Sequence, residues 1–149
     1  MNQQQALAKA RQFTDTAFGV EVNRITREFQ DKLQQSRAQM SARGILMSGM
    51  TVSETARISG ERITALIQAR LDRRLEGFEL HQVELTDGMV EELIKELMSL
   101  RSTWINNAGQ TYLHDPVLSR RQKAAIGRWW IGLQECIIMK SGRRLSAGG

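Results

Sequence analysis

The chain has 149 residues, of which 41% are hydrophobic and 25% are charged, and its formal net charge is +5. This length favours one domain with a core of its own, and the composition is ordinary for a soluble globular protein. The single cysteine, Cys136, excludes an intrachain disulfide and a metal site built from several cysteines.

The sequence predicts an all-α protein. It contains one proline and few stretches in which apolar residues alternate with polar ones, so strands have little support. We expect a four-helix, mostly antiparallel bundle that forms one domain over 1–140, followed by a flexible basic tail over 141–149. The expected helices lie near 3–42, 51–82, 86–112 and 116–140.

Targeting signals are not evident in the sequence. Residues 1–10 lack the apolar segment of a signal peptide, and no run reaches the roughly 18 apolar residues of a membrane span. We therefore expect a cytoplasmic protein.

The first helix is predicted to be unusually long. Between residues 6 and 40 there is no proline and one glycine, and apolar residues recur at steps of three and four. Several of them lie eleven residues apart, about 3.67 residues per turn, which keeps the stripe nearly straight. The helix should end near Arg43–Gly44, where glycine can adopt the left-handed conformation. Its apolar face must be buried against later helices, against a second copy of the chain, or against both. We expect the contacts with a second copy to be made by Phe18, Val22, Ile25, Phe29 and Leu33.

The second predicted helix carries segregated charge. Thr51-Val-Ser-Glu54 is typical of a capping box at a helix start. Further along, Arg62, Arg70 and Arg73 flank one side of the apolar face, and carboxylates line the opposite surface. This arrangement is compatible with a solvated helix of mixed charge or with a basic binding face.

The stretch 51–66 resembles a bacterial helix-turn-helix. Ala56 and Gly60 match the small residue of the first helix and the turn glycine, and Leu66 matches an apolar position of the recognition helix. The resemblance implies a DNA-binding helix that begins at Glu61 and Arg62, with Arg70 and Arg73 near phosphates. Ser59 and Glu61 depart from it, because that motif usually has apolar residues on both sides of the glycine. The alternative, which we favour, is one continuous helix with an internal glycine.

The remaining helices have clearer signals. Thr86 is a good N-cap for the third helix, and Asp115-Pro116 is a good start for the fourth. Arg101 lies within the apolar face of the third helix. It could extend to water at the rim of that face or form an internal ion pair, and we favour the rim.

In the fourth helix, aromatic residues (Trp129, Trp130) lie in the same helix as basic residues. This combination fits a membrane interface or a core helix, and we favour the core helix.

No catalytic signature is present. We find no HExxH, CxxC, P-loop or glycine-rich dinucleotide motif, and the two histidines, His81 and His114, lie near predicted helix ends. We therefore expect a protein that is not an enzyme and needs no cofactor or metal. The function that this pattern favours is a helical scaffold or protein–protein interaction module that self-associates as a dimer through its first helix.

The alternative function is nucleic-acid binding. A pI near 10 permits contact with nucleic acid, an anionic membrane or an acidic partner. Because several arginines lie beside carboxylates, we expect the surplus charge to be spread along the chain. The nucleic-acid interface would use Arg57, Arg62, Arg70, Arg73, Arg143 and Arg144.

Overall fold

The computed structural model describes residues 2–46, 49–113 and 120. Over these residues it is all-helical, with α1 at Gln3–Ala42, α2 at Gly49–Leu80 and α3 at Asp87–Leu113. Apart from Arg120, the predicted fourth helix lies outside the described residues, as do the basic tail with Arg143 and Arg144, Cys136 and His114.

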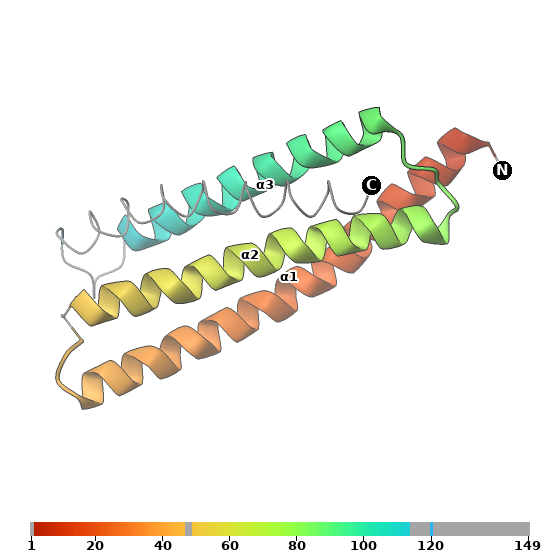
Figure 1. The fold of residues 1–149 in the computed structure, drawn as a ribbon. Helices are drawn as coiled ribbons and strands as arrows, with labels where there is room; N and C mark the ends of the chain where they lie inside the picture. The colour runs from red at the N-terminus through yellow and green to blue at the C-terminus, as the bar shows by residue number, and fades with distance from the viewer. Residues whose placement is uncertain (1, 47–48, 114–119, 121–149) are drawn as a thin grey trace.

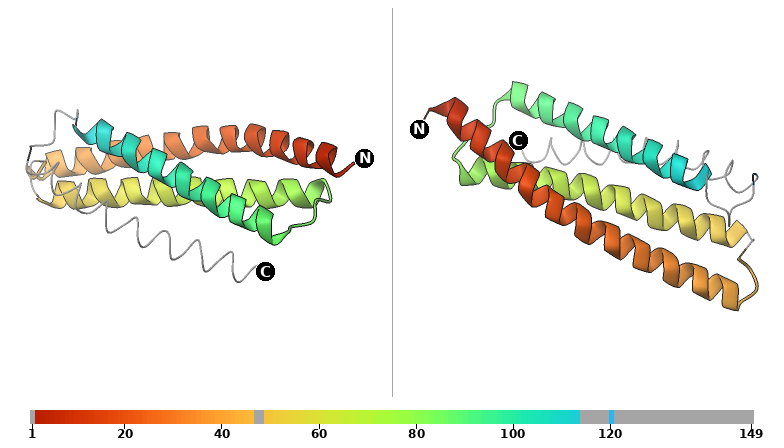
Figure 2. Two further views of the ribbon diagram at one scale, coloured as in Figure 1. Left: turned by 90° about the horizontal axis from the view of Figure 1, so that it is seen from above. Right: turned by 180° about the vertical axis from the view of Figure 1, so that it is seen from behind.

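The three helices run alternately up and down, with α2 between the other two (Figure 1). Both α1 and α3 pack on α2, whereas α1 and α3 make no close backbone approach to each other within the described residues. The two further views show the same arrangement, with α3 crossing over α2 at an angle (Figure 2). The fold is therefore organised around α2.

The contact between α2 and α3 is a conventional apolar core. Ile63, Ile67 and Leu71 of α2 are buried with apolar residues of α3. Each such aliphatic side chain contributes about 1.5–3 kcal/mol by leaving water. The α3 residues of this cluster are Leu93, Leu97, Ile105 and Ala108.

The contact between α1 and α2 depends on small residues near the end of α2. Ala6, Ala10 and Thr14 are buried on α1, and Gly77 is buried on α2. The Thr14 hydroxyl donates to the Ala10 carbonyl oxygen at 2.9 Å and reaches the Arg73 carbonyl oxygen of α2 at 3.4 Å. A Cβ atom added at Gly77 would lie 2.9 Å from the Ala10 carbonyl oxygen. The two backbones can therefore approach this closely only because residue 77 has no side chain.

Both turns between helices begin with the same C-cap geometry. After α1, Gly44 has φ +70°, its N–H donates to the Ser41 carbonyl, and the Ile45 N–H donates to the Met40 carbonyl. After α2, the N–H groups of Gln82 and Val83 bond back to residues 79 and 78 in the same pattern. These are Schellman motifs. The predicted glycine cap is confirmed, whereas the second motif places Gln82, at φ 54°, in the position that glycine favours.

The structure overturns two expectations for the helices and confirms two others. The capping box at Thr51 is wrong, because α2 already begins at Gly49 and the Thr51 hydroxyl donates to the Ile45 carbonyl oxygen at 3.0 Å. Arg101 is 6% exposed, so its rim position is also wrong. The continuous-helix interpretation is confirmed, since α2 passes through Gly60 without the break that a helix-turn-helix requires. Thr86 does cap α3, accepting the Met89 N–H at 3.3 Å.

Candidate functional site

Arginines of α2 extend from this central helix toward both neighbours. We call Arg62, Arg70, Arg73 and Arg74 the arginine seam. The last three follow Arg62 by eight, eleven and twelve residues, which places all four along one side of α2. Arg62 and Arg70 each contact α1 and α3, whose backbones do not approach each other. Within the described residues, the seam therefore connects α1 to α3 through side chains alone.

Arg62 lies between two aromatic rings. Its guanidinium carbon is 4.8 Å from the ring centroid of Phe29 in α1 and 4.8 Å from that of Trp104 in α3. It also donates to the Thr26 hydroxyl of α1 at 3.3 Å. A planar guanidinium can lie against aromatic faces in a way that an ammonium group cannot, so this position favours arginine over lysine.

Replacing Arg62 tests how much these ring contacts stabilise the fold. We expect Arg62→Ala to lower the free energy of unfolding by about 1.5 kcal/mol, since each cation–π contact contributes about 0.5–1 kcal/mol when partly exposed. Arg62→Lys should recover less than half of the loss. Urea denaturation followed by circular dichroism measures both changes. The exposed Arg27 of α1 provides the control, and Arg27→Ala should change stability by less than about 0.5 kcal/mol. Equal losses in the two alanine variants would contradict the role of the rings.

Arg70 and Arg74 share one carboxylate, that of Glu96 in α3. Arg70 Nη2 lies 2.5 Å from Glu96 Oε1, and Arg74 Nη2 lies 2.5 Å from Oε2. Burial alone would raise the pKa of Glu96, but the hydrogen bonds from Arg74 and Arg70 outweigh it, and the pKa lies below the ordinary value. Arg70 also pairs with Asp15 of α1 at 3.2 Å and lies over the Phe18 ring.

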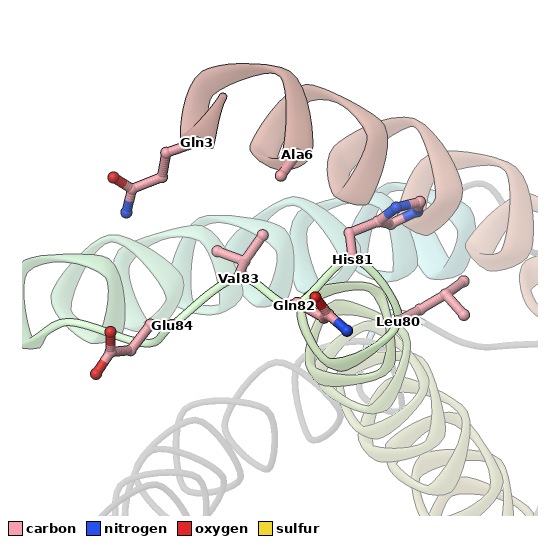
Figure 3. A pocket seen from close by; sticks show the side chains of 7 residues that line it. All are labelled: Gln3, Ala6, Leu80, His81, Gln82, Val83 and Glu84. Atoms are coloured by element: carbon pink, nitrogen blue, oxygen red, sulfur yellow. The ribbon is translucent and has the colours of Figure 1, made fainter. Parts of the chain in front are cut away.

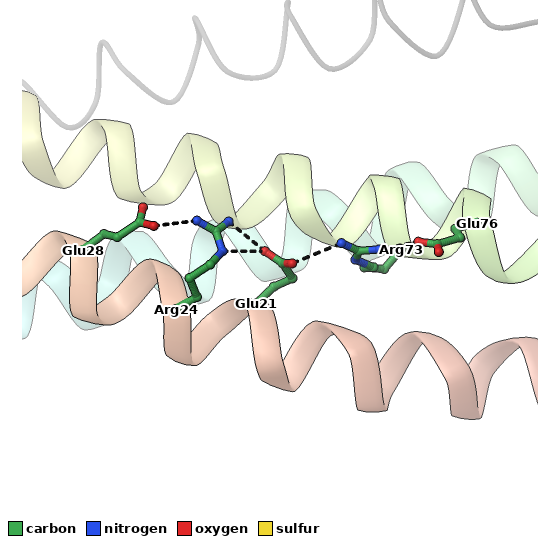
Figure 4. A network of polar contacts seen from close by, with 5 residues as sticks. All are labelled: Glu21, Arg24, Glu28, Arg73 and Glu76. Carbon is green, nitrogen blue, oxygen red and sulfur yellow. Dashed lines mark hydrogen bonds and ion pairs between the residues drawn. The ribbon is translucent and has the colours of Figure 1, made fainter.

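Arg73 belongs to a chain of ion pairs between α1 and α2 (Figure 4). Its Nη2 donates to Glu21 of α1 at 3.1 Å, and Nη1 pairs with Glu76. Glu21 also accepts from Arg24, which in turn pairs with Glu28 at 2.7 Å. The hydrogen bond from Arg24 is the largest cause of the lowered pKa of Glu21, with that from Arg73 acting in the same direction against desolvation. The carboxylate is held charged between two cations.

The structure places the five predicted dimer-contact residues in two environments. Ile25 is 4% exposed and lines a small cavity with Ile58 and Ala65 of α2, so it belongs to the intrachain contact. Phe18 and Phe29 are half-buried beneath Arg70 and Arg62. Val22 and Leu33 are also half-buried. Helix α2 and its arginines therefore cover this stripe in part, and four of its five residues keep some accessible surface.

The four residues of α2 that were predicted to bind nucleic acid are engaged with carboxylates or rings, whereas Arg143 and Arg144 lie outside the described residues. Arg57, on the outer surface of α2, pairs with Glu54 at 2.9 Å and with Glu61 at 2.6 Å. Arg62, Arg70 and Arg73 have the contacts described above. A phosphate would have to compete with these existing partners for each guanidinium. Sequence reasoning missed Arg74 and Glu96, because no spacing shows which of the carboxylates on α3 faces α2.

One end of the bundle has an open hollow of about 610 Å³ (Figure 3). It lies between the first turns of α1 and the segment that joins α2 to α3, and its walls mix polar and apolar side chains. Its lining residues are Gln3, Ala6, Leu80, His81, Gln82, Val83 and Glu84. Among the described residues, no group of three or more His, Cys, Asp or Glu side chains could hold a metal ion. No described helix has an apolar stretch that could serve as a membrane span.

Over the described residues the protein is all-helical, and its elongated helices are joined by arginine ion pairs and ring contacts. No protein-family model matches the chain, and the searches of curated proteins and of solved structures found no match to it either.

Proposed function

We propose that this protein is a non-enzymatic helical scaffold or protein–protein interaction module that self-associates through the apolar stripe of α1. The observation that carries the proposal is the incomplete cover of that stripe. Phe18, Val22, Phe29 and Leu33 remain half-buried although α1 already packs on α2. They form a row about 15 residues long, or roughly 22 Å at 1.5 Å per residue, which is long enough for a helix of a second copy to lie against.

The neighbouring surface of α1 adds apolar area. Val20, outside the stripe, is 67% exposed, and Gly19 beside it has no atom within 4 Å of where a Cβ would lie. Single exposed apolar residues are common on monomers, so Val20 alone carries little weight. Together with the row it leaves α1 with apolar side chains on more than one side, as in a helix that contacts partners on two sides.

A charge placed in the row tests the proposal. We expect Leu33→Asp to weaken self-association about a hundredfold, because a dimer with two-fold symmetry would contain the buried charge twice. Sedimentation velocity over a range of protein concentrations measures the dissociation constant. The matched control is Gln34→Asp, which introduces the same side chain at the adjacent, exposed position. Leu33 is preferred to Phe29 because an aspartate at residue 29 would lie beneath Arg62 and could pair with it.

Two results would overturn the proposal. One is a wild-type protein that sediments as a monomer at every accessible concentration. The other is equal weakening by Leu33→Asp and Gln34→Asp, which would show that added negative charge anywhere on α1 is sufficient. Circular dichroism of both variants establishes that the helices persist.

A further inference from the structure

The end of the bundle at which α2 leads into α3 is strongly acidic. Residues 75–94 contain six carboxylates and no lysine or arginine, although the whole chain has a formal net charge of +5. The positive charge is therefore not spread evenly along the chain, contrary to expectation. All six acidic side chains are exposed. We call this region the acidic end, and its carboxylates belong to Glu76, Glu79, Glu84, Asp87, Glu91 and Glu92.

Most carboxylates of the acidic end have no basic neighbour. Glu76 pairs with Arg73 of α2. The other five take part in no ion pair within the part of the chain that the structure describes. Elsewhere on the described helices, exposed carboxylates such as Glu28 and Glu61 each pair with an arginine. The acidic end therefore presents unbalanced negative charge to a partner.

Helix stability accounts for only some of these carboxylates. Asp87 lies in the first turn of α3, where the positive end of the helix dipole favours a negative charge. Glu79 lies in the last turn of α2, which contains no basic residue and where the dipole disfavours a carboxylate. Its charge therefore opposes the stability of its own helix. A residue that breaks a local rule of stability in this way is typical of a functional surface.

The acidic end also has accessible apolar surface. Leu80 is 61% exposed and Leu85 is 44% exposed. Leu80 lines the hollow of about 610 Å³ together with Ala6 and Val83 (Figure 3). Glu84 belongs to the same lining. The hollow can therefore accept apolar side chains of a partner next to a carboxylate that binds a charged group.

We propose that the acidic end is a docking surface for a basic segment of another protein, in which apolar side chains lie between lysines or arginines. The apolar side chains enter the hollow and lie against Leu80 and Leu85, and the basic side chains pair with Glu79 and Glu84. A metal ion fits this end poorly, because within the described residues no group of three or more His, Cys, Asp or Glu side chains could hold one. Carboxylates spread over two helices and their connection suit a polypeptide with several cationic groups.

Binding of a defined peptide tests the proposal. The first probe is a fluorescein-labelled peptide of about 18 residues, with leucine and lysine at helical spacing. The second probe has glutamine in place of every leucine. Full-length protein is titrated into each probe at low salt, and fluorescence anisotropy measures the affinity. We expect the leucine peptide to bind about tenfold more tightly than the glutamine peptide, because only the leucine peptide buries apolar side chains.

Two double variants of equal net charge locate the binding surface. The first, Glu79→Gln with Glu84→Gln, removes two carboxylates of the acidic end. The second, Glu28→Gln with Glu61→Gln, removes two exposed carboxylates elsewhere. We expect the first variant to lose about tenfold in affinity for the leucine peptide, and the second to stay within about twofold of the wild type.

Two further readouts separate docking from general charge attraction. Leu80→Gln should weaken binding of the leucine peptide about fivefold, whereas Met98→Gln, at an exposed apolar residue of α3, should leave it unchanged. Glu79→Gln should raise the melting temperature by about 1–4 °C, because it removes a carboxylate from the negative end of the α2 dipole. Weaker binding by a more stable protein cannot result from a folding defect.

The proposal fails if the wild type does not bind the leucine peptide at low salt, if it binds both peptides equally, or if the two double variants lose the same affinity. An oligomer that dissociates when Glu79 and Glu84 are replaced would instead assign the acidic end to a second copy. Much tighter peptide binding after deletion of residues 141–149 would assign it to the basic tail of the same chain. The apolar stripe of α1 is not part of this surface, so Leu33→Asp tests self-association separately and either proposal can fail alone.

Discussion

Gly77→Ala is expected to lower the free energy of unfolding by about 2 kcal/mol, and Gly77→Leu by about 3 kcal/mol or more. The added Cβ would lie 2.9 Å from the Ala10 carbonyl oxygen, 3.1 Å from Thr14 Oγ1 and 3.3 Å from a carbon of the Phe13 ring. The first of these atoms belongs to the backbone of α1, so the two helices must separate. Urea denaturation followed by circular dichroism measures the loss.

The same substitution elsewhere provides the control. Gly19 also lies inside a helix, α1, but no atom would come within 4 Å of an added Cβ. Gly19→Ala should therefore raise stability by about 0.5–1 kcal/mol, because alanine favours a helix interior over glycine. The two Gly→Ala changes thus have opposite predicted signs. A stabilised Gly77→Ala variant would show that α1 and α2 do not cross at this point.

Loss of the carboxylate shared by Arg70 and Arg74 has a comparably large expected effect. We predict that Glu96→Gln lowers the free energy of unfolding at pH 7 by about 3 kcal/mol, because two half-buried guanidinium groups lose their charged partner. Glu92→Gln, an exposed position on the same helix, should cost less than about 0.5 kcal/mol. Denaturant titration of the three proteins gives the comparison.

The pH dependence of stability shows whether Glu96→Gln destabilises the protein through the lost charge or through poorer packing. The pKa of Glu96 is lower in the folded state than the ordinary glutamate value of about 4.3. Its contribution is therefore fully present above that value and is lost as the pH falls through the folded-state pKa. The difference in stability between wild type and Glu96→Gln should shrink between pH 7 and pH 3. A difference that stays constant over this range would mean that the glutamine merely packs poorly.

Sequence patterns predict the helices well where the signals are local. The bounds 3–42 match α1, Thr86 caps α3 as expected, and Gly44 ends the first helix. These features depend on a few neighbouring residues. A hydroxyl group bonds to the backbone within one turn, and a glycine without a side chain adopts the left-handed conformation that ends a helix. The start of α2 was missed because Thr51 and Glu54 fit a capping box locally, yet the hydroxyl of Thr51 bonds to the preceding connection instead.

Contacts between helices are harder to predict. The apolar stripe of α1 contains the buried residues Ile25 and Met40, but the N-terminal half is buried through Ala6, Ala10 and Thr14, which lie off that stripe. Small residues have low hydrophobicity, so a periodicity of apolar residues does not reveal a close crossing. The arginines of α2 form a recognisable group, but their carboxylate, hydroxyl and ring partners on other helices include residues 22 to 55 positions away in the sequence. Periodicity on one helix cannot select a partner on another.

The central position of α2 also bears on how the chain folds. Each described helix makes close backbone contacts only with its neighbour in sequence, so within the described residues the tertiary structure can be built by pairing consecutive helices. Since the α1–α2 and α2–α3 hairpins are each held by their own contacts, either can form first. The contacts of Arg62 and Arg70, which involve α1 and α3 at once, are complete only when both hairpins have formed.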